Sequence, residues 1–288
     1  MIKVLVMSDL HLGPEGRVKY GLDTAQRFSS ALEDAARLYG DADLCVFAGD
    51  IADKGEAEAY QRFDEMRSEF KIPQAVLLGN HDDRETYLRV AQEPMTNGTH
   101  HVQGRRDIGD VRLLLLDSSE PGRVEGVLDQ ARLEWLRDEL ATAKAESKPV
   151  LIITHHHPQR LHMPVDRYKL TAPETLREVL DASGARIDLI LAGHCHIPTA
   201  GNWYGYSVAT ISGNQHRVSP FLPGMTGQQT SYEGPAQFAV ILHDEEECVV
   251  HFHNYVDRNI ALPDAMFPWK YDQWEHIPHF LRKTATYN

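Results

Sequence analysis

Short apolar runs alternate with amphipathic stretches along most of this 288-residue chain. Apolar runs bounded by polar turns are typical of β-strands that are covered on both faces. The predicted buried strands are residues 3–7, 43–48, 75–78, 111–116, 150–153 and 187–192. Stretches 24–39, 129–143 and 171–182 repeat their apolar side chains with a helical period, which predicts helices with one buried face. Strands and helices in alternation indicate a layered α/β fold.

The pattern changes after about residue 197, where strands are predicted at 208–212, 237–242 and 248–255 without helices between them. The connection 217–235 is long and rich in glycine, proline and polar residues. Such a connection is typical of a functional loop, which we expect near the substrate or a partner subunit. We assign residues 1–260 to one catalytic domain and 261–288 to an aromatic tail. The tail must pack on its own domain or on a partner subunit, and we expect a homo-oligomer.

The chain is acidic, with 29 Lys and Arg residues against 42 Asp and Glu residues and a net charge of −13. An acidic chain repels the phosphate backbone of nucleic acids, so binding along extended DNA or RNA is disfavoured. A small phosphorylated substrate remains compatible with this charge, because bound metal ions can reverse the local field.

The location of the protein is predicted from three further features. The apolar N-terminal run is too short for a signal peptide, and no window reaches the roughly 18 apolar residues of a membrane helix. The three cysteines are odd in number and far apart, which argues against a disulfide framework and fits a reducing compartment. We therefore expect a cytoplasmic protein with no membrane partner.

Side chains that bind metals follow five of the predicted strands. The blocks are Ser8-Asp9-Leu10-His11, Gly49-Asp50-Ile51-Ala52-Asp53, Gly79-Asn80-His81-Asp82-Asp83, Thr154-His155-His156-His157-Pro158 and Gly193-His194-Cys195-His196. Because the carboxyl ends of parallel strands lie along one edge of a sheet, the five blocks can converge. Residues two apart in an extended segment point the same way, so Asp9 and His11 can offer two ligands to one place. The glycines that open three of the blocks allow a close approach of the backbone.

The types of ligand indicate the chemistry of the predicted site. Carboxylate, amide and imidazole groups together suit Mn, Fe, Co or Zn ions. Asp50 can bridge two such ions, which would activate water and hold a phosphoryl group during in-line displacement. A single Asp-x-His at a strand end is common and carries little weight, but five blocks in order are far more specific. His251 and His253 have the same spacing in mid-strand, and we interpret them as the polar face of a sheet.

Together the five blocks resemble the calcineurin-like metallophosphoesterase family, whose pattern runs Asp-x-His, Gly-Asp, Gly-Asn-His, His-x-Pro and Gly-His-x-His. The resemblance covers residues 1 to about 200. Within the family, the chain is most similar to the class III cyclic nucleotide phosphodiesterases and bacterial glycerophosphodiesterases. The shared features are Gly-Asn-His-Asp-Asp at 79–83, Asp-Ser-Ser at 117–119 and Gln-Ala-Arg-Leu-Glu-Trp-Leu at 130–136. The resemblance implies a four-layer α/β/β/α sandwich of two facing mixed sheets flanked by helices.

The resemblance also implies the roles of individual residues. The first metal ion would be held by Asp9, His11, Asp50 and His196, and the second by Asp50, Asn80, His156 and His194. The catalytic residues would be Asp50, Asn80 and His81, with His81 orienting the phosphate or protonating the leaving oxygen. His216 matches a substrate-binding histidine of this branch and would act beside Asn80 and His81.

The run of three histidines leaves one ligand to be selected. In the family pattern the ligand stands two residues before the proline, which selects His156 rather than His155 or His157. His157 would then turn away from the site.

The sequence therefore predicts an enzyme, a metal-dependent phosphoric diester hydrolase with two divalent metal ions. Cyclic nucleotides such as 3′,5′-cAMP are the favoured substrates, and the alternatives are glycerophosphodiesters or broad hydrolysis of phosphodiesters and phosphonate monoesters. A phosphomonoesterase and a nuclease on short strands are rivals, although the acidic balance counts against the nuclease. A metal-stabilised scaffold without activity should have lost ligands, yet none of the seven expected positions is missing.

Overall fold

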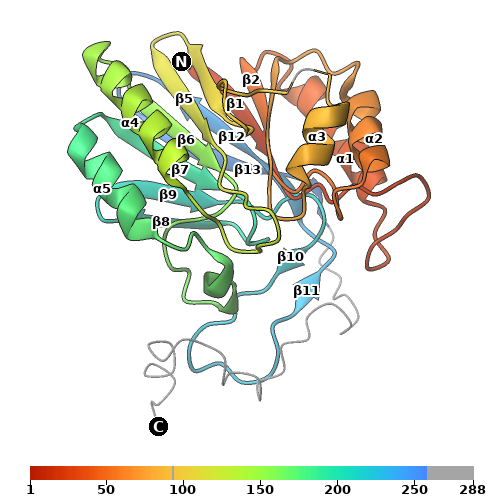
Figure 1. The fold of residues 1–288 in the computed structure, drawn as a ribbon. Helices are drawn as coiled ribbons and strands as arrows, with labels where there is room; N and C mark the ends of the chain where they lie inside the picture. Colours follow the sequence, from red (N-terminus) through yellow and green to blue (C-terminus); the bar gives the residue numbers. More distant parts are fainter. Residues whose placement is uncertain (93, 258–288) are drawn as a thin grey trace.

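Two β-sheets face each other between layers of helices in the computed structural model, which describes residues 1–92 and 94–257 (Figure 1). The first sheet has the order β13-β12-β1-β2-β3 and comprises β1 (Ile2–Met7), β2 (Leu44–Ala48), β3 (Gln74–Leu77), β12 (Ala236–His243) and β13 (Cys248–Val256). The second has the order β4-β5-β6-β7-β9-β8 and comprises β4 (Gly104–Ile108), β5 (Val111–Leu116), β6 (Val150–Thr154), β7 (Ile187–Ala192), β8 (Thr199–Trp203) and β9 (Tyr206–Thr210). The aromatic tail predicted at 261–288 lies outside the described residues.

The alternation of side chains along the central strands produces the layers. In β1, Val4 and Val6 pack between the two sheets with residues such as Leu113, whereas Leu5 and Met7 pack toward the helices. Burying an aliphatic side chain of this kind contributes roughly 1.5–3 kcal/mol. The first sheet is covered by α1 (Thr24–Leu38), α2 (Ala57–Arg67) and α3 (Arg84–Val90), and the second by α4 (Gln130–Ala145) and α5 (Pro173–Ser183). The predicted four-layer α/β/β/α sandwich of mixed sheets is confirmed.

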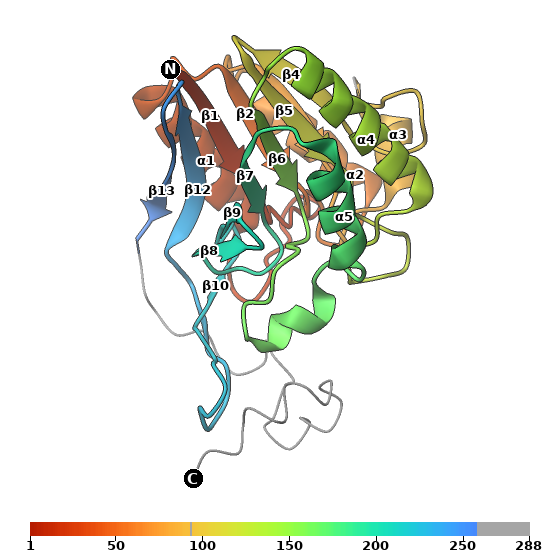
Figure 2. The ribbon, with the colours of Figure 1, turned by 90° about the vertical axis from the view of Figure 1, so that its left-hand side faces the viewer.

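Parallel pairing brings the carboxyl ends of strands from both sheets to one end of the molecule. Strands β1, β2 and β3 pair in parallel, and so do β5, β6, β7 and β9. Figure 2 shows β1, β6 and β7 running toward the same end. The loops that follow these strands can therefore meet, although the strands belong to different sheets.

Elements at the edges of the layers were not predicted from the sequence. Helix α2 buries only Ala59, Tyr60 and Phe63, too few for a clear helical period. Strand β4 reads Gly-Arg-Arg-Asp-Ile, and its polar composition is typical of a protected edge strand. By contrast, β5 and β7 have the predicted bounds, because these buried central strands are apolar at all but one position each, Arg112 and Asp188.

Two segments outside the sheets lie beside the strand ends. A 3₁₀ helix, η1 (Pro164–Tyr168), follows the three histidines after β6. The connection 217–235 contains a small antiparallel ribbon of β10 (Arg217–Val218) and β11 (Ser231–Tyr232). No helix in the described part of the chain is long and apolar enough to cross a membrane.

Candidate metal centre

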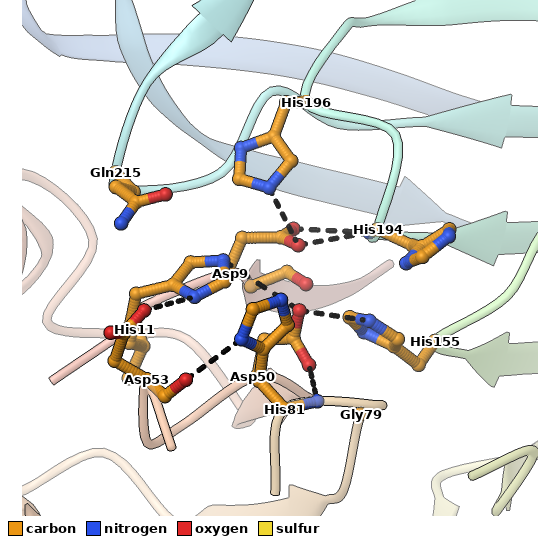
Figure 3. A network of polar contacts seen from close by, with 12 residues as sticks. Asp9, His11, Asp50, Asp53, Gly79, His81, His155, His194, His196 and Gln215 are labelled. Atoms are coloured by element: carbon orange, nitrogen blue, oxygen red, sulfur yellow. Dashed lines mark hydrogen bonds and ion pairs between the residues drawn. The ribbon is translucent and has the colours of Figure 1, made fainter. Parts of the chain in front are cut away.

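The polar blocks after β1, β2, β3, β6 and β7 meet in one space (Figure 3). The sequence suggested convergence along the edge of one sheet, but three of these strands belong to the first sheet and two to the second. The centre therefore lies where the two sheets face each other. The side chains whose ligand atoms gather there are Asp9, His11, Asp50, His81, His155, His156, His194 and His196.

Four overlapping groups of these side chains have ligand atoms within 4.8 Å of one another. The groups are Asp9-His11-His196, His11-Asp50-His81, Asp9-Asp50-His155 and His155-His156-His194. Asp50 belongs to two of them and links the side of His11 to the side of His155. Asn80 lines the same cleft. The structure thus brings together all the ligands predicted from the sequence, and adds His155.

The backbone at the centre is in an unusual conformation. Nine non-glycine residues in the described part of the chain have positive φ, and five of them are predicted metal ligands. Those five are Asp9 (φ 55°), His11 (47°), Asp50 (51°), His194 (69°) and His196 (51°). Left-handed backbone costs an ordinary L-residue roughly 1–2 kcal/mol, and such strain clusters at functional sites. Sharp turns after the strands thus aim the side chains inward.

Two glycines allow these loops to pack against each other. A Cβ added at Gly79 would lie 2.2 Å from Asp50 Oδ1 and 2.5 Å from the Asp50 amide nitrogen. At Gly193 it would lie 2.0 Å from Ser8 Oγ and 3.0 Å from Asp9 Oδ2. The close approach expected of the glycines in these blocks is confirmed at both positions.

Asp50 contacts several of the histidines at the centre, and its side chain is buried, with 1% of the residue exposed. Its Oδ1 accepts a hydrogen bond from the His81 amide (2.9 Å), and its Oδ2 lies 3.4 Å from His155 Nε2 and 3.6 Å from His11 Nε2. Burial raises the pKa of this carboxyl, but the positive charges of His155 and His81 outweigh burial and hold the pKa well below its usual range. Burial lowers the pKa of His155, yet Asp50 outweighs burial and raises it to about 9. A metal ion that binds His155 Nε2 must therefore displace a proton.

Several histidines use one ring nitrogen outside the centre and present the other to it. Nδ1 of His155 donates to the Ala48 carbonyl (2.9 Å), and Nδ1 of His196 donates to the His216 carbonyl (3.0 Å). Nδ1 of His11 lies 3.4 Å from the carboxylate of Asp53. Outer contacts of this kind fix the orientation of metal-binding imidazoles.

Buried atoms at the centre lack hydrogen-bond partners among the described residues. Nε2 of His194 and Oδ1 of Asn80 have none, and Nε2 of His11 and His155 have only their ion-pair contacts with Asp50. Burying a polar atom without a partner is costly, so such atoms in one place indicate a missing ligand. Imidazole nitrogens and an amide oxygen around a carboxylate are a donor set for a borderline divalent metal, and the residues fit such an ion.

The three consecutive histidines have different surroundings. His156 Nε2 donates to the Val124 carbonyl (3.0 Å), and its Nδ1 lies 2.8 Å from Ser118 Oγ. Binding a metal would cost His156 one of these hydrogen bonds, whereas Nε2 of His155 is directed at Asp50. His157 Nε2 lies 3.7 Å from Asp166. The structure thus places both His155 and His156 among the candidate ligands, and the selection of His156 from the sequence stays a prediction.

Sequence reasoning missed two further residues at this site. Asp53 contacts His11, accepts a hydrogen bond from His81 Nδ1 through its carbonyl (2.8 Å) and forms an ion pair with Lys19. Its position in the Gly49–Asp53 block was the available signal. Gln215 is 1% exposed and lines the cleft, and no residue of the described part pairs with its Nε2. Only its place beside His216, whose ring stacks on His196 at 4.0 Å, could have suggested it.

Comparison with known proteins agrees with this site. A family model for the calcineurin-like phosphoesterases matches residues 2–198. A probable cyclic nucleotide phosphodiesterase of Rhodopseudomonas palustris is 30% identical over 254 residues, covering 87% of this chain and 91% of the relative. The 3′,5′-cyclic adenosine monophosphate phosphodiesterase CpdA of Pseudomonas aeruginosa is 32% identical over 197 residues, covering 68% and 70%.

Other relatives and solved structures extend the likeness. A probable glycerophosphodiester phosphodiesterase GpdQ of Arcobacter nitrofigilis is 29% identical over 221 residues, covering 75% of this chain and 80% of the relative. A dimetal phosphatase from Danio rerio shares the fold, with a TM-score of 0.69 at 14% identity over 91% of this chain and 98% of that one. The chain belongs to the calcineurin-like phosphoesterase family and is a metal-dependent phosphoesterase.

Proposed function

We propose that this protein is a phosphodiesterase with two divalent metal ions that hydrolyses small phosphodiesters, with 3′,5′-cyclic nucleotides as its favoured substrates. The observation that carries the proposal is the pair of groups of close ligand atoms on either side of Asp50, in which buried atoms of His11, Asn80, His155 and His194 lack a hydrogen-bond partner among the described residues. One set consists of Asp9, His11, Asp50 and His196, and the other of Asp50, Asn80, His155 and His194. His155 replaces His156 in the second set because of the contacts described above. Relatives named for cyclic nucleotide hydrolysis support the substrate class.

When bound, the two ions supply an activated water and neutralise charge on the phosphoryl group. The residues of the chain orient the substrate and move protons. His81 Nδ1 donates to the Asp53 carbonyl, which leaves Nε2 of this partly exposed ring to serve the substrate. The ring lies 4.6 Å from that of His11. Because His81 stands beside the predicted ligand His11, its Nε2, when protonated, can give its proton to the leaving oxygen of the substrate.

The first test is hydrolysis of bis(p-nitrophenyl) phosphate beside p-nitrophenyl phosphate by metal-stripped protein, with Mn, Fe, Co or Zn added back. We expect metal-dependent activity that prefers the diester, followed by hydrolysis of 3′,5′-cAMP in preference to glycerophosphoethanolamine. Asp50→Ala serves as the inactive control, because it removes the residue shared by both ligand sets. Preference for the monoester would overturn the substrate class, and preference for glycerophosphoethanolamine would favour the glycerophosphodiesterase alternative, which a relative's name supports.

We further propose that Gln215 donates a hydrogen bond to a phosphoryl oxygen of the substrate. Its Oε1 accepts from His216 Nδ1 (2.9 Å), which leaves the buried Nε2 for the cleft. A hydrogen bond to a charged group contributes about 1.5–3 kcal/mol, so Gln215→Ala should lower kcat/KM at least about tenfold. Gln215→Glu should lower it further, because a carboxylate repels the phosphoryl charge.

Both Gln215 variants should keep the metal content and thermal midpoint of the parent protein. Metal content is measured by plasma mass spectrometry, and substrate affinity by calorimetric titration with inorganic phosphate. Loss of a metal ion in Gln215→Ala would show that the residue supports the ligands and not the substrate.

Residues 217–235 are proposed to form part of the substrate site, since Val218 and Gln229 line the cleft. The homo-oligomer and the cytoplasmic location expected from the sequence stay predictions.

A further inference from the structure

Beyond the metal ligands, the cleft has an apolar and aromatic lining that hydrolysis of a phosphate ester does not require. This lining consists of Tyr20, Val124, Val165, Tyr168 and Val218, and is called the side wall below. A phosphodiester carries an organic group on each side of phosphorus, so a small substrate held at the centre extends along the cleft. The chemistry of the side wall therefore bears on which substrate fits.

Val165 and Val218 form the aliphatic floor of the side wall, and this floor packs against the loop that carries His194 and His196. Val165 and Val218 pack with the buried Cys195 in a separate apolar cluster that also contains Met163 and Ile197. Cys195 stands between His194 and His196 in the chain, and its side chain belongs to this cluster. The apolar floor thus keeps a constant position relative to the ligands.

Tyr20 is held at the cleft by its backbone turn and by an ion pair of the neighbouring Lys19. It is 38% exposed and has a φ of 55°, a conformation that a bulky aromatic residue rarely adopts. Reciprocal hydrogen bonds between Lys19 and Leu22 (3.0 and 2.8 Å) close the tight turn that contains Tyr20 and Gly21. The Lys19 ammonium pairs with Asp53, which contacts His11. An exposed, strained tyrosine tied to the metal centre is a feature that core packing does not account for.

Tyr168 is presented by η1 from another part of the chain. It is the last residue of η1 and is half-buried at the cleft. The preceding loop is held by Asp166, which accepts a hydrogen bond from the Leu161 amide (2.7 Å) and lies near His157. Two tyrosines from separate loops thus line one cleft, together with the apolar floor.

The charges around the tyrosines restrict what this surface can bind. The Lys19 ammonium lies 5.3 Å from the centroid of the Tyr20 ring, and the Arg167 guanidinium lies 5.1 Å from that of Tyr168. Cations already interact with both rings, so a cationic headgroup such as choline or ethanolamine is disfavoured there. A neutral planar ring can stack on tyrosine and cover the aliphatic floor.

We propose that the side wall is a binding subsite for the nucleobase of a cyclic nucleotide, an inference that rests on the proposed phosphodiesterase function. The subsite, more than the metal centre, would then distinguish nucleotides from glycerophosphodiesters. Tyr20 and Tyr168 supply the stacking surfaces, and Val165 and Val218 supply the floor.

The test compares 3′,5′-cAMP with a cyclic phosphate of 1-deoxyribose that lacks the base. Metal-loaded wild-type protein should have the higher kcat/KM on 3′,5′-cAMP. Removing a stacking aromatic should reduce that preference by about tenfold in each of Tyr20→Ala and Tyr168→Ala, mainly through KM. The matched variants Tyr20→Phe and Tyr168→Phe should retain most of it. Tyr204→Ala removes another exposed tyrosine with positive φ, away from this cleft, and should leave the preference unchanged.

An inhibition experiment distinguishes failure of this proposal from failure of the proposed function. Inhibition of bis(p-nitrophenyl) phosphate hydrolysis by 5′-AMP is compared with inhibition by ribose 5-phosphate, so turnover of cyclic nucleotides is not needed. Stronger inhibition by 5′-AMP that weakens in the two alanine variants supports the subsite, even if 3′,5′-cAMP is not hydrolysed. Equal inhibition by both compounds would overturn it. Tyrosine substitutions that impair glycerophosphocholine more than 3′,5′-cAMP would also overturn it and point to a cation site.

Discussion

Replacing His155 with alanine is expected to reduce the metal content from two ions per chain to one and to lower diesterase activity about a thousandfold. His155 Nε2 faces Asp50 at 3.4 Å, and its Nδ1 is fixed by the Ala48 carbonyl. Losing an ion removes several kcal/mol of charge stabilisation from the transition state, which corresponds to this rate effect. Metal is counted by plasma mass spectrometry after dialysis against a defined metal buffer.

The matched variant is His156→Ala, in the adjacent residue of the same loop. Both nitrogens of His156 are engaged with Ser118 and Val124, so this variant should keep two ions and a substantial part of the activity. His251→Ala, at an exposed position on β13, controls for the loss of a histidine as such. Loss of an ion in His156→Ala together with its retention in His155→Ala would reverse the assignment.

Gly79→Ala is expected to abolish measurable activity and to destabilise the fold by about 1–3 kcal/mol or more, as overpacking of a rigid site does. The added methyl group would lie 2.2 Å from Asp50 Oδ1, 2.5 Å from the Asp50 nitrogen and 2.7 Å from His155 Nε2. Because backbone is among these atoms, the loop cannot accept the methyl group by a side-chain rotation. Asp50 must move, and both ligand sets lose their shared member.

Gly201→Ala provides the control for Gly79→Ala. Gly201 lies in β8, and no atom of the described residues lies within 4 Å of a Cβ added there. Unfolding in urea and metal content are measured for both variants. Normal metal content and activity in Gly79→Ala would mean that the loops after β2 and β3 are less tightly packed than the structure indicates.

The sequence predicted the layers and most of the residues that gather at the centre, because both depend on local patterns. The apolar runs at 111–116 and 187–192 coincide with β5 and β7, since each strand is apolar except for one charged residue next to its first position. The ligand-bearing blocks follow strands directly, so the residue types alone identified Asp9, Asp50 and Asn80 as members of one site.

The remaining features depend on contacts that the sequence does not encode locally. The chain leaves β6 at Thr154, and whether His155 or His156 then faces Asp50 depends on the exact turn after the strand. Gln215 and Tyr20 stand outside the five ligand-bearing blocks and carry no motif of their own. Their place in the cleft follows only from the meeting of two sheets and several loops.

The positive φ angles at Asp9, His11, Asp50, His194 and His196 bear on the stability margin of the whole domain. At roughly 1–2 kcal/mol each, their combined cost is comparable to the net stability of a typical domain. Ions that bind only the folded chain add stability by mass action and offset this cost. A descendant that abandoned the chemistry would become more robust by placing glycine or asparagine at these five positions. The concentration of free metal would therefore set how much free energy of unfolding the domain can lose through further mutations before it unfolds.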